Sequence, residues 1–200
     1  MNELSNKEKI LKAASAILLD KGLGSLSVRA IAQDAGLSTI AIYSHFENKQ
    51  GVLDALYIEG FSLVREAVES TRDTEDPVIA AIKSGEAYLD IAHYNEGHYR
   101  LIFGETGSQY LPSPDAQRAA NEAFDVLVRH VAALLPPDAS PGSKQRAALR
   151  VWATLHGYVS LRHHVIGQLM DYQQWRNMTL DSFEKVVKDL KETAPLSGLV

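Results

Sequence analysis

The sequence predicts an all-α protein of about nine helices. Apolar residues recur at the i, i+3, i+4 and i+7 spacing of a helix face along most of the 200 residues, and the alternation typical of strands is almost absent. Hydrophobic residues make up 46% of the chain, which is enough for a sizeable core. Gly, Pro and capping residues separate the helical stretches, so we expect globular helical domains throughout.

Two helices are predicted near the N-terminus, of which the second is short. The first begins after Ser5, which forms a capping box with Glu8, and it ends at Gly22. Ser27 caps the second helix, whose apolar positions fall on one face. Gly36 follows its last turn, where the chain needs a residue that adopts a positive φ without strain.

The third helix, also short, is predicted to have two different faces. Ser38 caps it, and Ile42 and Phe46 point inward one turn apart. Its outward positions are Thr39, Ile40, Tyr43 and Ser44. Two short, closely crossing helices with such an outward face are typical of a helix-turn-helix, here at about 27–46, whose second helix enters a DNA major groove.

The remaining helices are expected at 48–70, 76–93, 99–103, from about 115 to 135, 143–167 and 179–191. A loop is expected at 104–115. Its GETGSQ stretch (104–109) lacks the lysine and the strand-helix context of a phosphate-binding loop, and it is interpreted as a turn.

Charge and composition narrow the class of protein. Residues 1–50 carry six Lys or Arg against five Asp or Glu, and the other 150 carry fourteen against twenty, which together give the net charge of −5. Such an acidic chain argues against nonspecific coating of nucleic acid. The absence of cysteine excludes thiolate catalysis, disulfides and cysteine zinc sites. Neither a secretory signal nor a membrane-length apolar run is apparent, so a cytoplasmic location without membrane contact is expected.

The motif resembles that of the TetR/AcrR family of transcriptional repressors. SVRAIAQDAGLS at 27–38, followed by IYSHFENK at 42–49, carries the family's capped second helix, its Ala-Gly turn and its Tyr-x-His-Phe sequence. The resemblance implies base contacts from Arg29, Thr39 and Ile40. It implies phosphate contacts from Ser27, Ser38, Tyr43, His45 and Lys49.

Three of these assignments have alternatives. The family commonly has Gly or Pro where this chain has Ile40, which could touch a thymine methyl group or could shift the docking. For His45 the alternative is a structural hydrogen bond, and for Tyr43 it is half-buried packing.

The rest of the chain resembles a C-terminal domain class of the same family marked by a Trp and a His-Gly pair. The resembling stretches are WATLHGYVSLRHH at 152–164 and HYRLIFGE at 98–105. The resemblance implies a DNA-binding domain at 1–50 and an effector-binding and dimerisation domain at 51–200, whose last two long helices pair with those of a second copy. Two recognition helices about one DNA turn apart would read a palindrome.

An effector pocket is expected among aromatic and histidine side chains, which offer apolar surface with polar tips. The candidates are Tyr88, His93, Tyr94, Tyr99, Phe103, Phe124, Trp152, His156 and Tyr158. Ordinary core packing is the alternative for each of them. Trp152 and His156 lie one turn apart and could simply lock two helices together.

Together with the motif, the resemblance implies a homodimeric, ligand-responsive repressor of palindromic operators in double-stranded DNA, released by a small, largely apolar effector. No metal or cofactor is expected, since the histidines lack ligand spacing. No enzyme is expected either, since no nucleophile with its base is apparent. Two alternatives stay open: a helical ligand-binding protein without a DNA-binding role, and an activator of the same architecture.

Overall fold

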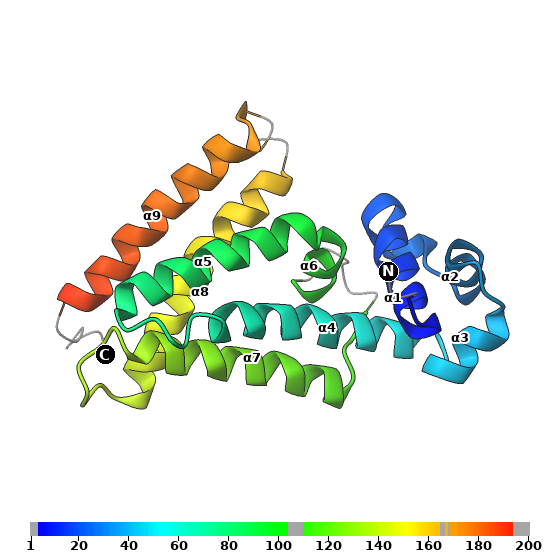
Figure 1. The fold of residues 1–200 in the computed structure, drawn as a ribbon, viewed down its shortest axis with the longest axis horizontal. Coiled ribbons are helices and arrows are strands. Elements are labelled where there is room, and N and C mark those ends of the chain that lie inside the picture. The colour runs from blue at the N-terminus through cyan, green and yellow to red at the C-terminus, as the bar shows by residue number, and fades with distance from the viewer. Residues whose placement is uncertain (1–3, 104–109, 165–166, 168, 194–200) are drawn as a thin grey trace. The chain divides into compact units, whose positions relative to one another are not determined.

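The computed structural model describes residues 4–103, 110–164, 167 and 169–193, and over these residues the fold is all-α, as predicted (Figure 1). The described residues form nine α-helices and one short 3-10 helix, with no strand. The elements are α1 (Asn6–Lys21), η1 (Leu23–Ser25), α2 (Val28–Ala35), α3 (Thr39–Phe46), α4 (Lys49–Glu69), α5 (Pro77–Tyr94), α6 (Glu96–Ile102), α7 (Pro114–Ala132), α8 (Pro141–His163) and α9 (Tyr172–Glu192).

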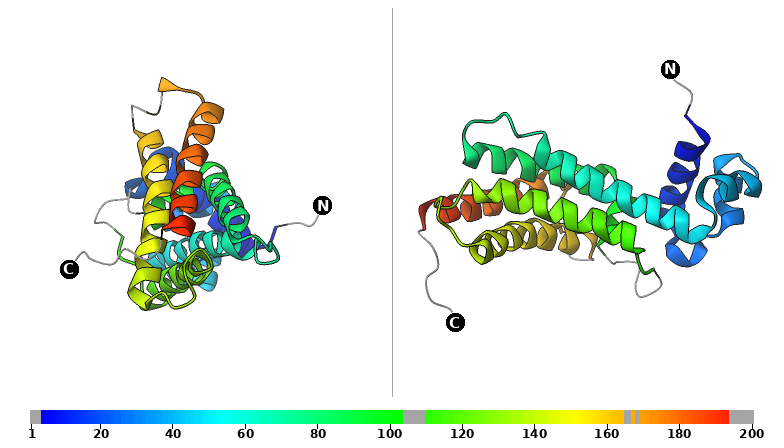
Figure 2. Two further views of the ribbon diagram at one scale, coloured as in Figure 1. Left: turned by 90° about the vertical axis from the view of Figure 1, so that its left-hand side faces the viewer. Right: turned by 90° about the horizontal axis from the view of Figure 1, so that it is seen from below.

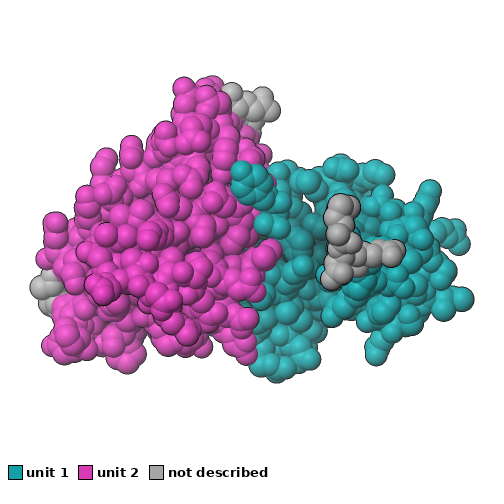
Figure 3. Space-filling model, viewed as in Figure 1, with its two compact units in different colours: residues 1–62, 94–121 teal, residues 63–93, 122–200 magenta. Residues whose placement is uncertain are grey.

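Contacts along the chain group it into two compact units (Figure 3). Unit 1 comprises residues 1–62 and 94–121, and unit 2 comprises residues 63–93 and 122–200. Unit 1 extends beyond residue 50 because the first half of α4 shares a core with α1, α2 and α3, and because α6 packs on α1. The division into functional domains at residue 50 stays a prediction.

The capping residues of unit 1 perform the local roles predicted from the sequence. Ser5 and Glu8 form a reciprocal capping box at the start of α1. At the end of α1, Gly22 has φ 72°, and Gly36 after α2 has φ 66° and ψ 31°, in the left-handed region. Both positive φ values explain why glycine ends these helices without strain.

The helices α1, α2 and α3 gather around the first half of α4 (Figures 1 and 2). Their inward side chains form one apolar core, in which Ile10, Ile31, Ile42, Val52 and Leu56 are fully buried. Burying such a side chain contributes roughly 1.5–3 kcal/mol, so this core fixes α3 against α4.

In unit 2, α8 and α9 run side by side and in opposite directions (Figures 1 and 2). Phe183 of α9 is 1% exposed and lies against Gly85 of α5. A Cβ atom added at Gly85 would lie 2.4 Å from Cε1 of Phe183, which is closer than two non-bonded carbon atoms can approach. The close packing of α5 on α9 therefore requires glycine, which has no side chain, at position 85.

We expect Gly85→Ala to lower the free energy of unfolding by about 1–3 kcal/mol, because the added methyl overpacks the contact with Phe183. Denaturant unfolding would measure this. Adding Phe183→Leu to Gly85→Ala should recover part of the loss, since a smaller side chain makes room for the methyl. A double variant less stable than the sum of both single changes would contradict this account.

A pH dependence is expected from His130 of α7, which is half-buried beside a cavity lined partly by Thr71, Arg129 and Ala133. Burial lowers the pKa of His130, while a hydrogen bond from its ring to the Ala80 carbonyl opposes this. The unfolded chain takes up this proton near pH 6.5, above the folded pKa, so the free energy of unfolding should decrease as the pH falls below about 6.5.

Denaturant unfolding at several pH values between 7.5 and 5, a range that brackets pH 6.5, measures this dependence. His130→Leu should show a smaller loss of stability over that range than the unchanged chain. An identical pH dependence in both proteins would show that His130 does not titrate as described.

Several predicted boundaries were wrong. The last helix begins at Tyr172 rather than 179, because Asp171 and Gln174 form a capping box ahead of its apolar residues. The helix predicted at 143–167 begins at Pro141, capped by Ser140, and ends at His163. The short helix predicted at 99–103 is α6, which starts three residues earlier. Of the predicted loop at 104–115, residues 104–109 lie outside the described residues, and α7 already begins at Pro114.

Candidate nucleic-acid interface

The helix α3 separates its side chains into a buried and an exposed face. Ile42 is 0% exposed and Phe46 is 7% exposed, and both belong to the core of unit 1. On the other face Thr39 is exposed, Ile40 is 76% exposed and Tyr43 is 54% exposed. An isoleucine exposed to this extent on a rigid helix is available for an apolar contact with a partner such as a thymine methyl group.

The two serine candidates for phosphate contact lie at helix N-termini. The Ser27 hydroxyl accepts a hydrogen bond from the Ala30 backbone N–H at 3.1 Å, and the Ser38 hydroxyl accepts one from the Ala41 N–H at 3.3 Å. Each serine is exposed, and its hydroxyl hydrogen remains available to donate. A helix N-terminus with an outward hydroxyl donor can hold a phosphate oxygen.

The other three charged or titratable candidates, Arg29, His45 and Lys49, differ in their exposure to solvent. Arg29 of α2 and His45 of α3 are exposed, and among the described residues His45 makes no hydrogen bond, although its ring lies 6.3 Å from that of Phe46. Lys49, at the start of α4, is half-buried, and its Nζ donates to the Leu23 carbonyl at 3.5 Å. The structure thus places all eight predicted side chains on α2, α3, their caps and the start of α4.

A tight turn sets the angle between α3 and α4. Glu47 has φ 60° and ψ −43°, and the Asn48 N–H donates to the Phe46 carbonyl at 2.6 Å, which is a strained γ-turn with a positive φ. The turn brings the Phe46 carbonyl so close to α4 that a Cβ atom at Gly51 would lie 2.1 Å from its oxygen. The Asn48 side chain accepts from the Gly51 N–H at 3.0 Å and caps α4. Neither the γ-turn at Glu47 nor the capping of α4 by Asn48 is predicted from the sequence.

The nine effector-pocket candidates divide between the two units. Tyr94, Tyr99 and Phe103 belong to unit 1, where Tyr94 is 76% exposed and Tyr99 is 1% exposed. The Tyr99 and Phe103 rings lie 4.6 Å apart, and Phe103 also contacts Phe61 edge-on at 5.9 Å. These rings pack within unit 1.

The six candidates of unit 2 lie in several small groups. The Trp152 ring lies 6.0 Å from that of Phe124 and 6.3 Å from that of His156. His93 stacks on Tyr172 at 3.9 Å. Tyr158 shares a hydrogen bond of 2.8 Å with Ser182, and Tyr88 is buried. The Phe124, Trp152 and His156 rings are thus the largest set of candidates brought together in unit 2.

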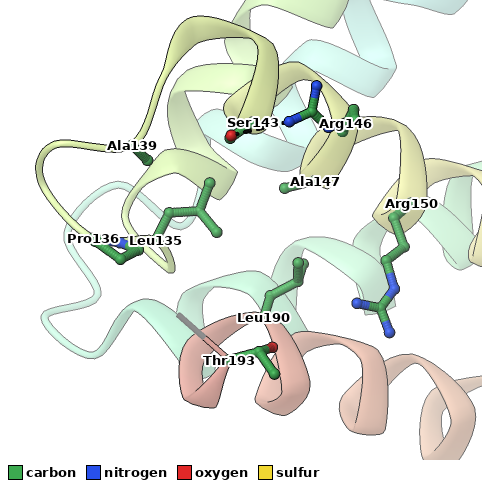
Figure 4. Close-up of a pocket in the computed structure, with 9 residues that line it drawn as sticks. All are labelled: Leu135, Pro136, Ala139, Ser143, Arg146, Ala147, Arg150, Leu190 and Thr193. Atoms are coloured by element: carbon green, nitrogen blue, oxygen red, sulfur yellow. Dashed lines mark hydrogen bonds between the residues drawn. The ribbon is translucent and has the colours of Figure 1, made fainter. Parts of the chain in front are cut away.

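Other residues line a second cavity of unit 2, between the α7–α8 turn, the first turns of α8 and the C-terminal end of α9 (Figure 4). Its lining residues are Leu135, Pro136, Ala139, Ser143, Arg146, Ala147, Arg150, Leu190 and Thr193. Arg146 donates to the Ser143 hydroxyl at 3.2 Å, and Arg150 pairs with Asp189 at 2.6 Å. None of the nine predicted effector residues lines this cavity.

The described residues include neither a membrane-spanning helix nor a cluster of metal ligands. No helix there combines the length and apolar character that crossing a membrane requires. Within the same residues, no three His, Asp or Glu side chains come together in a way that could hold a metal ion.

The chain is similar to known regulators in sequence. The model of the tetR family of bacterial regulatory proteins matches residues 10–56, and a tetracyclin-repressor-like C-terminal domain model matches residues 81–190. The HTH-type transcriptional regulator Rv1816 of Mycobacterium tuberculosis is 27% identical over 135 residues, which are 62% of this chain and 56% of that protein. The HTH-type transcriptional activator FasR of Mycolicibacterium smegmatis is 30% identical over 143 residues, 64% of this chain and 63% of FasR.

A solved structure shares the fold. A protein of unknown function from Rhodococcus sp. RHA1 superposes with a TM-score of 0.71 at 26% identity, over 92% of this chain and 96% of that one. The C-terminal domain model alone matches more than half of the 200 residues. With the N-terminal match over the helix-turn-helix, this shows that the chain belongs to the TetR family of bacterial regulatory proteins.

Proposed function

We propose that the protein is a homodimeric transcriptional repressor that binds palindromic operators in double-stranded DNA and is released by a small, largely apolar effector. It would act in the cytoplasm, without a cofactor and without enzymatic activity. The observation that carries the proposal is the exposed face of α3, where Ile40 and Tyr43 point outward from a helix anchored by buried Ile42 and Phe46.

The exposed side chains of α2, α3 and the Ser27 cap have the chemistry to contact both bases and phosphates. Arg29 can donate two hydrogen bonds to a guanine, Thr39 can donate or accept one, and Ile40 suits a thymine methyl group. The hydroxyl groups of Ser27 and Tyr43 can fix the position of the helix on the backbone. Most of these groups are uncharged, so affinity would depend on geometry and on two half-sites more than on net charge.

A dimer is supported by apolar side chains on the outer surface of α8. Leu149 and Leu161 are each 50% exposed. Exposed apolar side chains can contribute to an interface between two copies, and the resemblance to the family implies pairing of the last two long helices. Dimer formation would bring two α3 helices to one palindrome.

The effector site is proposed in the C-terminal part of the chain, with Phe124, Trp152 and His156 as the first residues to test. Their rings supply apolar surface, and the His156 nitrogens supply a polar contact. A ligand would release DNA only to the extent that it binds the DNA-free conformation more tightly than the DNA-binding one.

An activator of the same architecture is the second candidate. It is favoured by the 30% identity to FasR, which is named as an activator. The two candidates share the DNA-reading surface and differ in where the operator lies relative to the promoter. A reporter gene placed behind the selected operator would distinguish them by the sign of the change in expression.

The test of DNA binding is selection of bound duplexes from a random pool at near-physiological salt, with light scattering to determine the oligomeric state. Enrichment of a palindrome by a dimer is the expected result. A folded dimer, free of bound ligand, that enriches no sequence would overturn the proposal and leave ligand binding as the function to pursue.

A further inference from the structure

The carboxylate of Asp54, on α4, accepts hydrogen bonds from the segment that precedes α7. Oδ1 of Asp54 accepts from the Tyr110 hydroxyl at 2.7 Å, from the Ser113 backbone N–H at 3.2 Å and from the Gln50 amide at 3.1 Å. The same Gln50 amide donates to the Leu111 carbonyl at 2.9 Å. We call Gln50, Asp54, Tyr110 and Ser113 the Asp54 clamp.

The Tyr110 end of the clamp is part of the core that holds α3. Tyr110 is 7% exposed and belongs to the same apolar cluster as Ile42 and Phe46, and its ring lies 5.7 Å from that of Tyr57. Burial and the adjacent Asp54 carboxylate raise the pKa of Tyr110 well above its ordinary value, so the phenol remains a donor at every physiological pH. Its hydroxyl therefore stays able to donate to Asp54.

The Ser113 end of the clamp fixes the start of α7. The Ser113 hydroxyl accepts from the Ala116 N–H at 3.3 Å and thus caps α7, while the Ser113 N–H is bound to Asp54. One carboxylate therefore holds the residue that begins α7. That carboxylate lies in the second turn of α4, just after the tight turn that follows α3.

The charge of Asp54 strengthens each hydrogen bond of the clamp. Among the described residues no Lys, Arg or His contacts this carboxylate, and it is stabilised by three hydrogen-bond donors. Hydrogen bonds to an ionised group are about twice as strong as neutral ones, so each donor contributes substantially to holding the clamp closed.

From this geometry we infer that the Asp54 clamp is a positioning element for DNA reading, which holds the start of α7 against the first half of α4 and thereby fixes the angle at which α3 is presented. The inference rests on the proposed DNA-binding function. It assigns Asp54 and Tyr110 a role in DNA affinity, although neither lies on the exposed face of α3. Opening the clamp populates α4 positions that do not fit the operator, and the apparent affinity falls with the fraction of competent molecules.

The test variant is Tyr110→Phe, which removes the hydroxyl and keeps the buried ring. Tyr57→Phe is the matched control, because it removes a hydroxyl from the neighbouring ring without touching Asp54. We expect Tyr110→Phe to weaken binding to the selected palindrome by about three- to tenfold, and Tyr57→Phe by less than about twofold. The double variant Asp54→Ala/Tyr110→Phe should bind no more weakly than Asp54→Ala alone, because both changes open the same clamp.

Hydrogen exchange in the full-length protein without DNA separates this inference from the proposed function. Tyr110→Phe should speed exchange in α3 and the first half of α4 as well as at 110–116, while Tyr57→Phe should not. If the unchanged protein binds no DNA, the proposed function fails, and faster exchange in α3 still supports the mechanical link. Operator affinity of Tyr110→Phe equal to or higher than that of the unchanged protein, or exchange altered only at 110–116, would overturn the inference.

Discussion

Replacing Arg29 and Tyr43 together by alanine is expected to weaken operator binding by about two orders of magnitude, because each residue contributes roughly 1–3 kcal/mol of contact with a base or a phosphate. Both side chains are exposed, so their loss should leave the fold intact. Fluorescence anisotropy with the selected palindrome measures the affinity, and thermal unfolding checks that the melting temperature stays within a few degrees of the parent.

The single changes should separate the two kinds of contact. Arg29→Ala is expected to relax the preference for one base pair of each half-site, because the arginine is assigned to a base edge. Tyr43→Ala should weaken binding to all sequences by a similar factor, because a phosphate contact carries no sequence information. Repeating the selection with each variant tests this assignment.

A control with the same charge change is available elsewhere on the surface. Arg72 has an exposed side chain and lies outside the helix-turn-helix. The variant Arg72→Ala should bind the operator as the parent does. Parental affinity in the Arg29→Ala/Tyr43→Ala protein would show that DNA, if bound at all, contacts another surface.

The features that the sequence predicts well are those whose chemistry lies within one helical turn. Ser27 and Ser38 cap their helices, and Gly36 takes the left-handed conformation, because each requirement involves a backbone group a few residues away. Ile42 and Phe46 are buried because their spacing places them on one face of α3. Local periodicity is enough for these assignments.

The features that the sequence does not predict depend on contacts between residues far apart in the chain. The hydrogen bond between Asp54 and Tyr110 joins positions 56 residues apart, and Gly85 meets Phe183 across an even longer interval. Periodicity states which face of a helix is buried, but it does not identify the opposite side chain. For this reason the aromatic candidates for the effector site could be named from the sequence, whereas their distribution over several groups could not.

The second large effect is expected at Gly51, where alanine would place its Cβ atom 2.1 Å from the Phe46 carbonyl oxygen. The obstacle is backbone, already held in a strained γ-turn by Glu47, so no side chain can move aside. Gly51→Ala should therefore lower the unfolding free energy by about 3 kcal/mol or more, which corresponds to roughly 6–12 °C in melting temperature.

The expected effect of Gly51→Ala on DNA binding follows from the same clash. The turn can accept a methyl group only by rotating α3 away from α4, so surviving folded protein should bind the operator at least about tenfold more weakly than the parent. Gly24→Ala is the matched control, since a Cβ atom there meets nothing within 4 Å. If Gly51→Ala matched Gly24→Ala in melting temperature and operator affinity, the close approach of α4 to the Phe46 carbonyl would not determine the angle between α3 and α4. A loss confined to Gly51→Ala would show that the turn before α4, as well as the residues that touch DNA, determines operator binding.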